Sequence, residues 1–465
     1  MITATRAETD WGRFRVGFQA ELLARIPEHL ERLSWSAEQI ESAQRDGLRR
    51  LLAHAVAHSP FHRRRLGGTD IAGIEPADLA SLPVMTKSDM LAAVDDVFTD
   101  RRLSLAAIER ALAATGSEPV PVPGRYMALA TGGSTGQRGV FVFDPAAKAK
   151  FILSIVRSLL ARLYAADGIP PGGLPMAMVG AGSAVHATGA AAAETAGTGV
   201  PLRVTSVPVT LPWPQIVARL NALQAPCLIG FASALARLAA EQSAGRLHIA
   251  PAVIISTSET LLPEARAEIT AAFSTPVVNS FASTEGLMGS SAPGGDVLMF
   301  NSDMCIIELV DADNRPVGPG VPSAKVLVTN LYNLAQPLIR YELADSFVYE
   351  PSAGGPGLLL ARAHGRADEV FHYQAGDLHP HVIRSIMLRS PEVADYQVRQ
   401  TLTGIEADII AAGGASAEAL RRRLMEALAQ GGLSRPDVTV RIAGDLPRCA
   451  GSGKLRRFIP LSRMA

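Results

Sequence analysis

The sequence is poor in the features that would place it in several common classes of protein. It has three cysteines, Cys227, Cys305 and Cys449, whose odd number and wide spacing exclude a disulfide framework and a cysteine-based zinc site. A reducing cytoplasm is therefore the expected location. The 44 basic residues balance the 44 acidic ones, which argues against nucleic acid or an anionic membrane as a partner. We also expect no secretory leader and no membrane span, because no apolar run is long enough.

What the chain does have is length and apolar content. At 465 residues it exceeds one ordinary hydrophobic core, so at least two domains are expected. Its 48% hydrophobic and 19% charged residues are typical of a globular protein with a large interior. Roughly the first 120 residues show helical spacing, as in Leu48, Leu51 and Leu52. From about Arg125, short apolar runs alternate with helical stretches, a βαβ rhythm that favours largely parallel sheets covered by helices.

Two further patterns follow towards the C-terminus. The runs 304–310 and 325–331 are bounded by turn residues and predict antiparallel strands or a small barrel. After residue 364, the order helix, strand, strand, helix, strand is typical of a ferredoxin-like unit of about a hundred residues. The predicted fold class is therefore α/β. A large N-terminal domain (residues 1–364) of helix-covered sheets with a small barrel-like subdomain precedes a small ferredoxin-like α+β C-terminal domain (365–465).

The segment ATGGSTGQRGVFVF at 130–143 is the most informative part of the chain. Its glycines let backbone N–H groups approach an anion closely, and Thr131, Ser134 and Thr135 add hydroxyl donors. Residues 140–143 are predicted to form a strand that fixes the loop. This is the chemistry of a phosphate cradle, although the Walker motif is absent. Taken alone, a loop of this composition is more often a plain connection.

Several short segments, taken in their order and spacing, resemble the phenylacetate–CoA ligase branch of the adenylate-forming enzymes. Those enzymes join a carboxylic acid to AMP from ATP and then pass the acyl group to a thiol. The segments are SPFHRR at 59–64, LPVMTKSD at 82–89, the loop at 130–143, NSFASTE at 279–285, PLIRYELAD at 337–345, GRAD at 365–368 and LPRCAGSGKLRRF at 446–458. The resemblance covers nearly the whole chain.

The resemblance implies a nucleotide site. In the loop, Thr131, Gly133, Ser134, Thr135 and Gly136 would hold the β- and γ-phosphates of ATP. The other implied nucleotide contacts are Ser258 and Glu259 at the adenine pocket, where the family has Gly-Glu, Phe281 against adenine, Thr284 at the α-phosphate and Asp345 at the ribose. Arg366 would be a second contact, to the ribose or to a phosphate.

The same resemblance implies the catalytic groups. Thr284, Glu285 and Lys454 would be catalytic, and Glu285 would hold Mg²⁺, which prefers hard oxygen ligands and shares them with phosphates. Lys454 would bridge the substrate carboxylate and the α-phosphate, where negative charge gathers. Asp368 would be the hinge of a mobile C-terminal lid. Ordinary readings stay open: Glu285 as a surface helix-start carboxylate, Lys454 as an exposed tail lysine and Asp345 as a turn residue.

The acyl pocket has candidate residues that are mostly small and apolar. They are Val179, Gly180, His186, Phe231, Ala232 and Ala282. His186 is read either as a pocket wall or as a core histidine, and Arg340 as a structural ion-pair residue. Small apolar walls suit a planar aryl acid without a charged tail, and the resemblance also points to aryl or arylacetic acids.

The predicted function is that of an AMP-forming acid–thiol ligase of the acyl-CoA synthetase type. It would activate an aromatic carboxylic acid as acyl-adenylate and transfer it to the thiol of coenzyme A. The implied cofactors are ATP, Mg²⁺ and coenzyme A, or the phosphopantetheine of a carrier protein. The implied partners are these small molecules and the aromatic acid. Members of the family often form dimers, so the resemblance also suggests a homodimer.

Two alternatives stay open. The first is a stand-alone adenylating enzyme that loads an acyl-carrier protein or transfers AMP to another acceptor. The second is a catalytically silent nucleotide-binding interaction protein. The loop motivates the second, because the family often has a proline and a lysine where this chain has Arg138 and Gly139.

Overall fold

The computed structural model divides the chain into two compact units, and the boundary between described residues falls between His364 and Gly365. The residues it describes are 10–123, 125–131, 139–165, 168–196, 201–351, 357–366, 369–378, 380–388, 390, 392–411, 416–449 and 453–461, with the backbone alone at 381, 384, 385 and 388. Within that part of the chain, no helix combines the length and apolar character that crossing a membrane requires.

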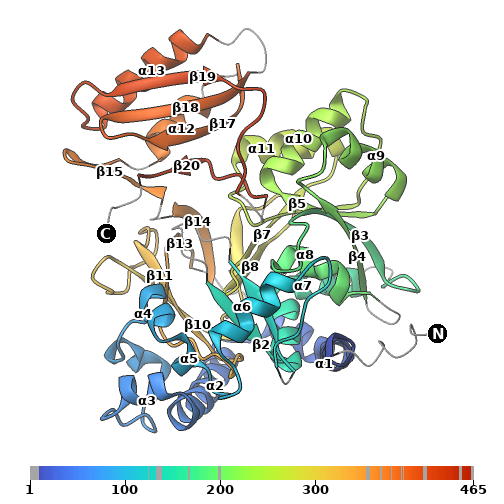
Figure 1. Ribbon diagram of the computed structural model, residues 1–465, viewed down its shortest axis with the longest axis vertical. Helices are drawn as coiled ribbons and strands as arrows, with labels where there is room; N and C mark the ends of the chain where they lie inside the picture. The colour runs from blue at the N-terminus through green and yellow to red at the C-terminus, as the bar shows by residue number, and fades with distance from the viewer. Residues whose placement is uncertain are drawn as a thin grey trace. The chain divides into compact units, whose positions relative to one another are not determined.

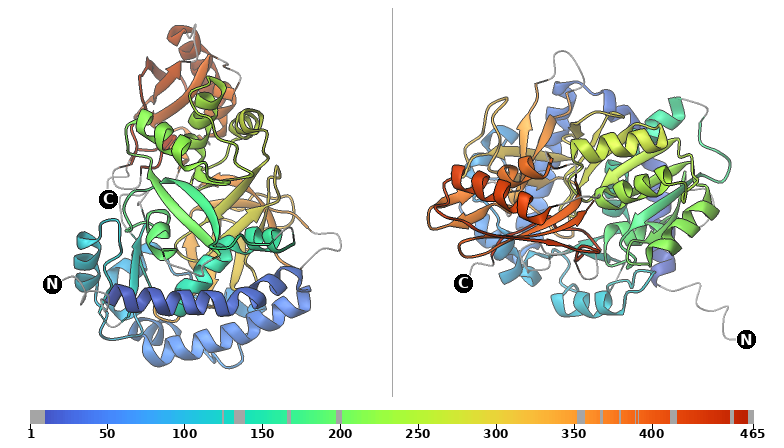
Figure 2. Two further views of the ribbon diagram at one scale, coloured as in Figure 1. Left: turned by 90° about the vertical axis from the view of Figure 1, so that its right-hand side faces the viewer. Right: turned by 90° about the horizontal axis from the view of Figure 1, so that it is seen from above.

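The first unit begins with the predicted helical region. Its helices are α1 (Asp10–Glu31), α2 (Ala37–His58), α3 (Pro60–Leu66), α4 (Lys87–Ala92), α5 (Val94–Val97) and α6 (Leu105–Ala114). Ser36 and Thr86 begin α2 and α4 with reciprocal capping boxes. Pro60 ends the α2 pattern and starts α3, where its missing N–H leaves no helical bond unmade. α1 packs along α7 (Pro145–Ala165), a contact that can be followed in Figure 2.

A nine-stranded sheet in the order β13-β14-β9-β8-β7-β6-β5-β3-β4 forms the centre of this unit. Its strands are β3 (Leu174–Gly180), β4 (Leu202–Pro208), β5 (Cys227–Phe231), β6 (Val253–Thr257), β7 (Val277–Ala282), β8 (Met288–Ser291), β9 (Val297–Phe300), β13 (Asp345–Tyr349) and β14 (Leu360–Arg366). Strands β3 to β7 run parallel, whereas β7–β8, β8–β9 and β9–β14 are antiparallel pairs. The expectation of a largely parallel sheet is therefore wrong for one half, because the chain reverses after β7 through a tight turn instead of a helix.

Helices cover the parallel half of the sheet. They are α8 (Ala187–Glu194), α9 (Trp213–Leu223), α10 (Ala232–Ser243) and α11 (Pro263–Phe273). Figure 1 shows α9, α10 and α11 together beside β3 and β5. A core of buried side chains such as Leu228, Leu235 and Ile254 joins α9, α10 and α11 to the strands. The near-continuous apolar strands are typical of a sheet that is buried on both faces.

Two smaller sheets complete the first unit. The hairpin β1 (Met127–Ala130) and β2 (Val140–Phe143) is antiparallel, so the strand predicted at 140–143 is confirmed. The second sheet is the antiparallel set β10 (Cys305–Val310), β11 (Lys325–Asn330) and β12 (Tyr341–Leu343), as the turn-bounded runs predicted.

The second unit has a four-stranded sheet in the order β19-β18-β17-β20. Its elements are β15 (Phe371–Tyr373), β16 (Gly376–Leu378), α12 (His381–Leu388), β17 (Val393–Gln400), β18 (Gly404–Ala411), α13 (Ala417–Gln430), β19 (Asp437–Ile442) and β20 (Phe458–Ile459). Leu420, Leu424 and Leu428 repeat every fourth residue on α13 and are fully buried in the core of this unit. The expected order helix, strand, strand, helix, strand is present from α12 to β19.

Candidate functional site

Most candidate residues of the first unit stand where parallel strands end. Gly180 ends β3, Phe231 ends β5, Ser258 follows β6 and Ala282 ends β7. The strands are neighbours in the sheet, with Thr257 paired to both Phe231 and Ser280. Because the carboxyl ends of parallel strands share one edge, these residues gather at the edge where α/β proteins bind ligands.

The glycine and hydroxyl loop leaves the β1–β2 hairpin through a pair that we call the loop clasp, Thr131 and Gly139. The N–H of Thr131 donates to the Gly139 carbonyl at 2.9 Å, and the N–H of Gly139 donates to Thr131 Oγ1 at 3.0 Å. The clasp holds the two ends of the loop at a fixed separation. The predicted phosphate contacts Gly133, Ser134, Thr135 and Gly136 lie outside the described residues.

Two buried amide side chains fix the outer edge of this hairpin. Gln336 donates to the Val140 carbonyl and accepts from the N–H of Val142, both at 3.0 Å. Asn333 donates to the Val142 carbonyl at 2.9 Å. Gln336 is 0% exposed and Asn333 is 2% exposed. The segment that follows β11 therefore completes the hydrogen bonding of β2 in place of a further strand.

The turn between β7 and β8, residues 283–287, is called the tip here, and it carries Thr284 and Glu285. Gly286 has φ +111°, and a Cβ there would lie 2.8 Å from the Tyr332 hydroxyl, so the position requires glycine. Asn330 Nδ2 donates to the Glu285 carbonyl, and Asn301 Nδ2 donates to the Gly286 carbonyl, both at 2.9 Å. Thr284 and Glu285 are half-buried, and the side chains of Asn330 and Asn301 hold the backbone of this turn.

The tip and the loop clasp are joined through these amides. Asn330, which holds the tip, accepts from the N–H of Asn333 at 3.0 Å. Asn333 in turn holds β2, as does Gln336. We call Asn301, Asn330, Asn333 and Gln336 the buried amides. They fix two candidate regions relative to each other, and sequence reasoning missed all four.

Ser258 and Glu259 form a strained turn after β6. Ser258 has φ +66°, a left-handed conformation that glycine adopts without penalty and that is strained for serine. Glu259 Oε2 accepts from the N–H of Ser233 at 2.9 Å, near the start of α10. A carboxylate in the first turn of a helix interacts favourably with the free N–H groups there. Glu259 is thus fixed by the fold at the edge of the sheet.

Phe281 joins β7 to β13, the strand that Asp345 begins. Its ring contacts Phe347 at 5.1 Å between centroids and Phe300 at 6.0 Å, both edge-on. Asp345 and Phe347 are two residues apart in β13, so their side chains share a face. Asp345 is 7% exposed, and its carboxylate is therefore placed on the Phe281 side of the sheet. The structure brings these two predicted nucleotide contacts together.

The acyl-pocket candidates divide between core and surface. Val179, Phe231 and Ala232 are buried in the core shared with α10, and a Cβ on Gly180 would lie 3.6 Å from the Phe231 ring. Ala282 is half-buried at the end of β7.

His186 is half-buried as well and caps α8. Its Nδ1 lies 3.1 Å from the Ala130 carbonyl, and the N–H of Ala130 donates to the Val185 carbonyl at 2.9 Å. His186 therefore sits beside the end of β1, next to the loop clasp.

The remaining predicted residues belong to the second unit or the boundary. Arg366 ends β14 and is half-buried, while the predicted hinge Asp368 lies outside the described residues. Lys454 is half-buried on a loop that is closed by the N–H of Cys449 donating to the Lys454 carbonyl at 2.9 Å. Gln397 Nε2 fixes this loop by donating to the carbonyls of Pro447 and Arg456.

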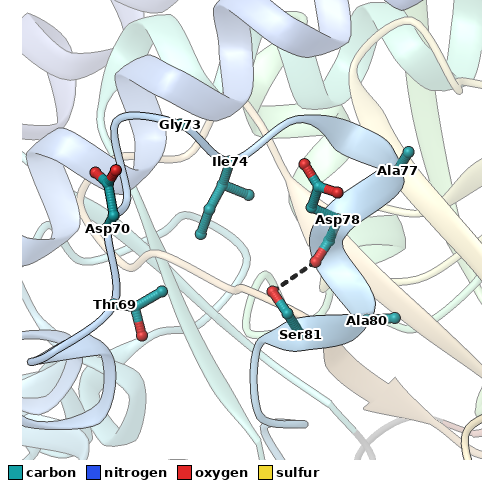
Figure 3. A pocket seen from close by; sticks show the side chains of 8 residues that line it. All are labelled: Thr69, Asp70, Gly73, Ile74, Ala77, Asp78, Ala80 and Ser81. Atoms are coloured by element: carbon teal, nitrogen blue, oxygen red, sulfur yellow. Dashed lines mark hydrogen bonds between the residues drawn. The ribbon is translucent and has the colours of Figure 1, made fainter.

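Two other features lie apart from this set. Arg340 is 3% exposed and forms a bidentate pair with Glu308 at 2.9 and 3.0 Å, so its reading as a structural ion-pair residue is confirmed. A surface hollow lies among the N-terminal helices, and Figure 3 shows Asp70, Asp78 and Ser81 in its lining. None of the candidate residues lines that hollow, so it is not part of the site.

Comparison with solved structures identifies the fold. The chain aligns with 2-hydroxyisobutyryl-CoA ligase in the postadenylation state, in complex with R3-HIB-AMP, at a TM-score of 0.66 and 17% identity over 92% of this chain and 91% of that one. ATP-bound MatB from Rhodopseudomonas palustris aligns at 0.50 and 17% identity over 70% and 65%. The anthranilate CoA ligase AuaEII, in complex with anthranoyl-AMP, aligns at 0.50 and 15% identity over 70% and 64%. No family model matches the sequence, and no curated protein matches it. The chain therefore has the fold of adenylate-forming ligases.

Proposed function

We propose that this protein activates an aromatic carboxylic acid with ATP and transfers the acyl group to the thiol of coenzyme A. The observation that supports the proposal is that the buried amides join the hairpin of the loop clasp to the tip after β7, while Phe281 of β7 packs against the strand that Asp345 begins. A loop that offers N–H and hydroxyl donors beside a carboxylate suits a magnesium-bound triphosphate. The chain shares its fold with two CoA ligases and with ATP-bound MatB, and this similarity supports the same chemistry.

The residues of the first unit would bind and orient the nucleotide. Asp345 would accept hydrogen bonds from the ribose hydroxyls, and Phe281 would pack against adenine. Glu285 would hold Mg²⁺, which needs few protein ligands when phosphates supply the others. Among the described residues, no group of three His, Cys, Asp or Glu side chains forms a metal cage. Bound Mg²⁺ neutralises charge that develops on the phosphates.

The proposed reaction has two steps. In the first, a carboxylate oxygen of the acid attacks the α-phosphorus, the bond to the bridging oxygen breaks, and pyrophosphate leaves. In the second, a thiolate attacks the acyl carbon and AMP leaves with the bonding electrons. Lys454 would stabilise the charge of the first step, because its ammonium group would stand where the carboxylate and the α-phosphate meet.

The acid is proposed to be aromatic because the candidate residues at the ends of β3, β5 and β7, among them Gly180, Phe231 and Ala282, are small or apolar and carry no charge. The comparisons include a ligase bound to anthranoyl-AMP and another bound to a hydroxyisobutyryl adenylate. A panel of aryl, arylacetic and small hydroxy acids in an ATP–pyrophosphate exchange assay tests the choice. Exchange with aryl acids is expected, and exchange confined to aliphatic acids would overturn it.

The acceptor and the role of Lys454 are tested with the same protein. Mass spectrometry of products formed with coenzyme A and with a holo-carrier protein identifies the acceptor. A product on the carrier protein alone would show that coenzyme A is not the acceptor. Lys454→Ala should lower exchange roughly a hundredfold or more. Arg422→Ala, which removes an exposed cation from the same unit, is the matched control. Equal rates in both variants would contradict the role of Lys454.

A further inference from the structure

Tyr341 is a buried residue at the base of the candidate site. It begins β12 and is 1% exposed. Its ring meets the ring of Phe141 edge-on, with centroids 6.4 Å apart. Phe141 lies beside the loop clasp, because a Cβ on Gly139 would stand 3.0 Å from the Phe141 ring and 3.0 Å from Thr131 Oγ1. Tyr341 therefore packs against the hairpin from which the glycine and hydroxyl loop leaves.

Tyr341 also shares a sheet face with residues that hold the tip. It is paired with Val328 of β11, and Asn330 lies two residues further along that strand. Cross-strand partners face the same side of a sheet, as do alternate residues of one strand. The side chain of Asn330 donates to the Glu285 carbonyl, so this face of the sheet covers the tip. Tyr341 consequently lies between the tip and the loop clasp.

The hydroxyl of Tyr341 has no hydrogen-bond partner among the described residues. A buried polar group in this state costs free energy and calls for an explanation. Burial, and then the negative charges of Glu285 and Glu342, hold the pKa of Tyr341 well above its ordinary value. The phenol therefore keeps its proton at neutral pH and is available as a donor.

We propose that the Tyr341 hydroxyl binds nucleotide by donating a hydrogen bond to an oxygen of a magnesium-bound triphosphate, at the β- and γ-phosphate end. This assignment rests on the proposed function. It follows from the position of Tyr341 between the tip, which carries Glu285, and the loop clasp. None of the described residues accepts the proton of its hydroxyl. No bond to the phenol forms or breaks, and its proton stays on the oxygen.

Calorimetric titration of the full chain tests this assignment. Tyr341→Phe should weaken Mg·ATP binding roughly ten- to a hundredfold, because a hydrogen bond to a charged oxygen is lost. AMP lacks the β- and γ-phosphates, so its Kd should be the same for the variant and the wild type. The melting temperature without nucleotide should stay equal or rise, because the phenol has no partner in the free protein.

Tyr332→Phe is the matched control. Its hydroxyl is likewise buried without a hydrogen-bond partner among the described residues, but it lies against the backbone of the tip, 2.8 Å from the point where a Gly286 Cβ would stand. Its loss should therefore leave Mg·ATP binding unchanged, which separates the position of Tyr341 from the mere lack of a partner. If the wild type binds no Mg·ATP, the proposed function fails. If it binds and Tyr341→Phe behaves like Tyr332→Phe, the inference alone fails. Equal weakening of ATP and AMP, or a lower melting temperature of the free variant, also overturns it.

Discussion

Gln336 is expected to control the order of the hairpin that presents the phosphate-binding loop. Replacing it with methionine keeps the volume of the side chain but removes the donor to the Val140 carbonyl and the acceptor of the Val142 N–H. Each buried backbone group left unpaired costs about 1–3 kcal/mol, so the two together should cost about 2–4 kcal/mol after the apolar gain of the thioether. Gln374→Met, at an exposed position of the second unit, is the control.

Hydrogen exchange is the sharpest measure of this loss. The Val142 amide donates only to Gln336 among the described residues, so its protection should fall about thirtyfold or more in Gln336→Met, since 1.4 kcal/mol corresponds to a factor of ten. Mg·ATP should also bind more weakly, because the loop clasp then rests on a less ordered hairpin. Unchanged exchange at Val142 would refute the view that Gln336 holds β2.

Two further predictions concern stability. Gly286→Ala should destabilise the first unit by about 2 kcal/mol or more and weaken Mg·ATP binding, because φ is +111° and the new Cβ would meet Tyr332. Gly245→Ala is the control, because Gly245 has φ +67° but no atom within 4 Å of the new Cβ, so it adds backbone strain without a clash. Equal losses of unfolding free energy in urea for the two variants would refute the clash. Burial lowers the pKa of His62 to about 4, against the opposing hydrogen bond to Pro337. The unfolded chain therefore binds more protons between pH 6.5 and 4, so stability falls as the pH falls through that window, by about 2 kcal/mol at pH 5. His62→Gln should flatten this dependence, and an unchanged slope in unfolding experiments would count against it.

Local patterns were sufficient to predict many elements of the fold. The second helix expected after residue 364 is α13, because its buried leucines repeat at four-residue spacing and Ser416 caps it. The strand after the glycine loop is β2, since four consecutive apolar residues follow a turn. The half-antiparallel character of the large sheet was missed. Nothing in the local composition of β7 and β8 separates a hairpin return from a helical crossover.

The candidate site was predictable only where its residues carry a recognisable order along the chain. The positions at the ends of β6 and β7 were found in this way, and the structure places them at one edge of the sheet. The buried amides could not be found, because their role depends on partners far along the chain. Gln336 and Val142 are 194 positions apart, and polar residues in the segment that follows β11 read as an ordinary loop. A signal was present only in the concentration of Asn and Gln between apolar residues from 330 to 336.

The roles proposed for the two units predict different effects of mutation on nucleotide binding and on the rate of adenylation. The tip and the loop clasp are fixed by side chains that bind backbone atoms, so the first unit carries the cost of ordering them before any ligand arrives. Lys454 stands on a loop of the second unit and would act where charge develops. Changes in the buried amides should therefore raise the Kd for Mg·ATP. Lys454→Ala should lower the rate of adenylation with little change in that Kd, because an interaction made only in the transition state leaves ground-state binding intact.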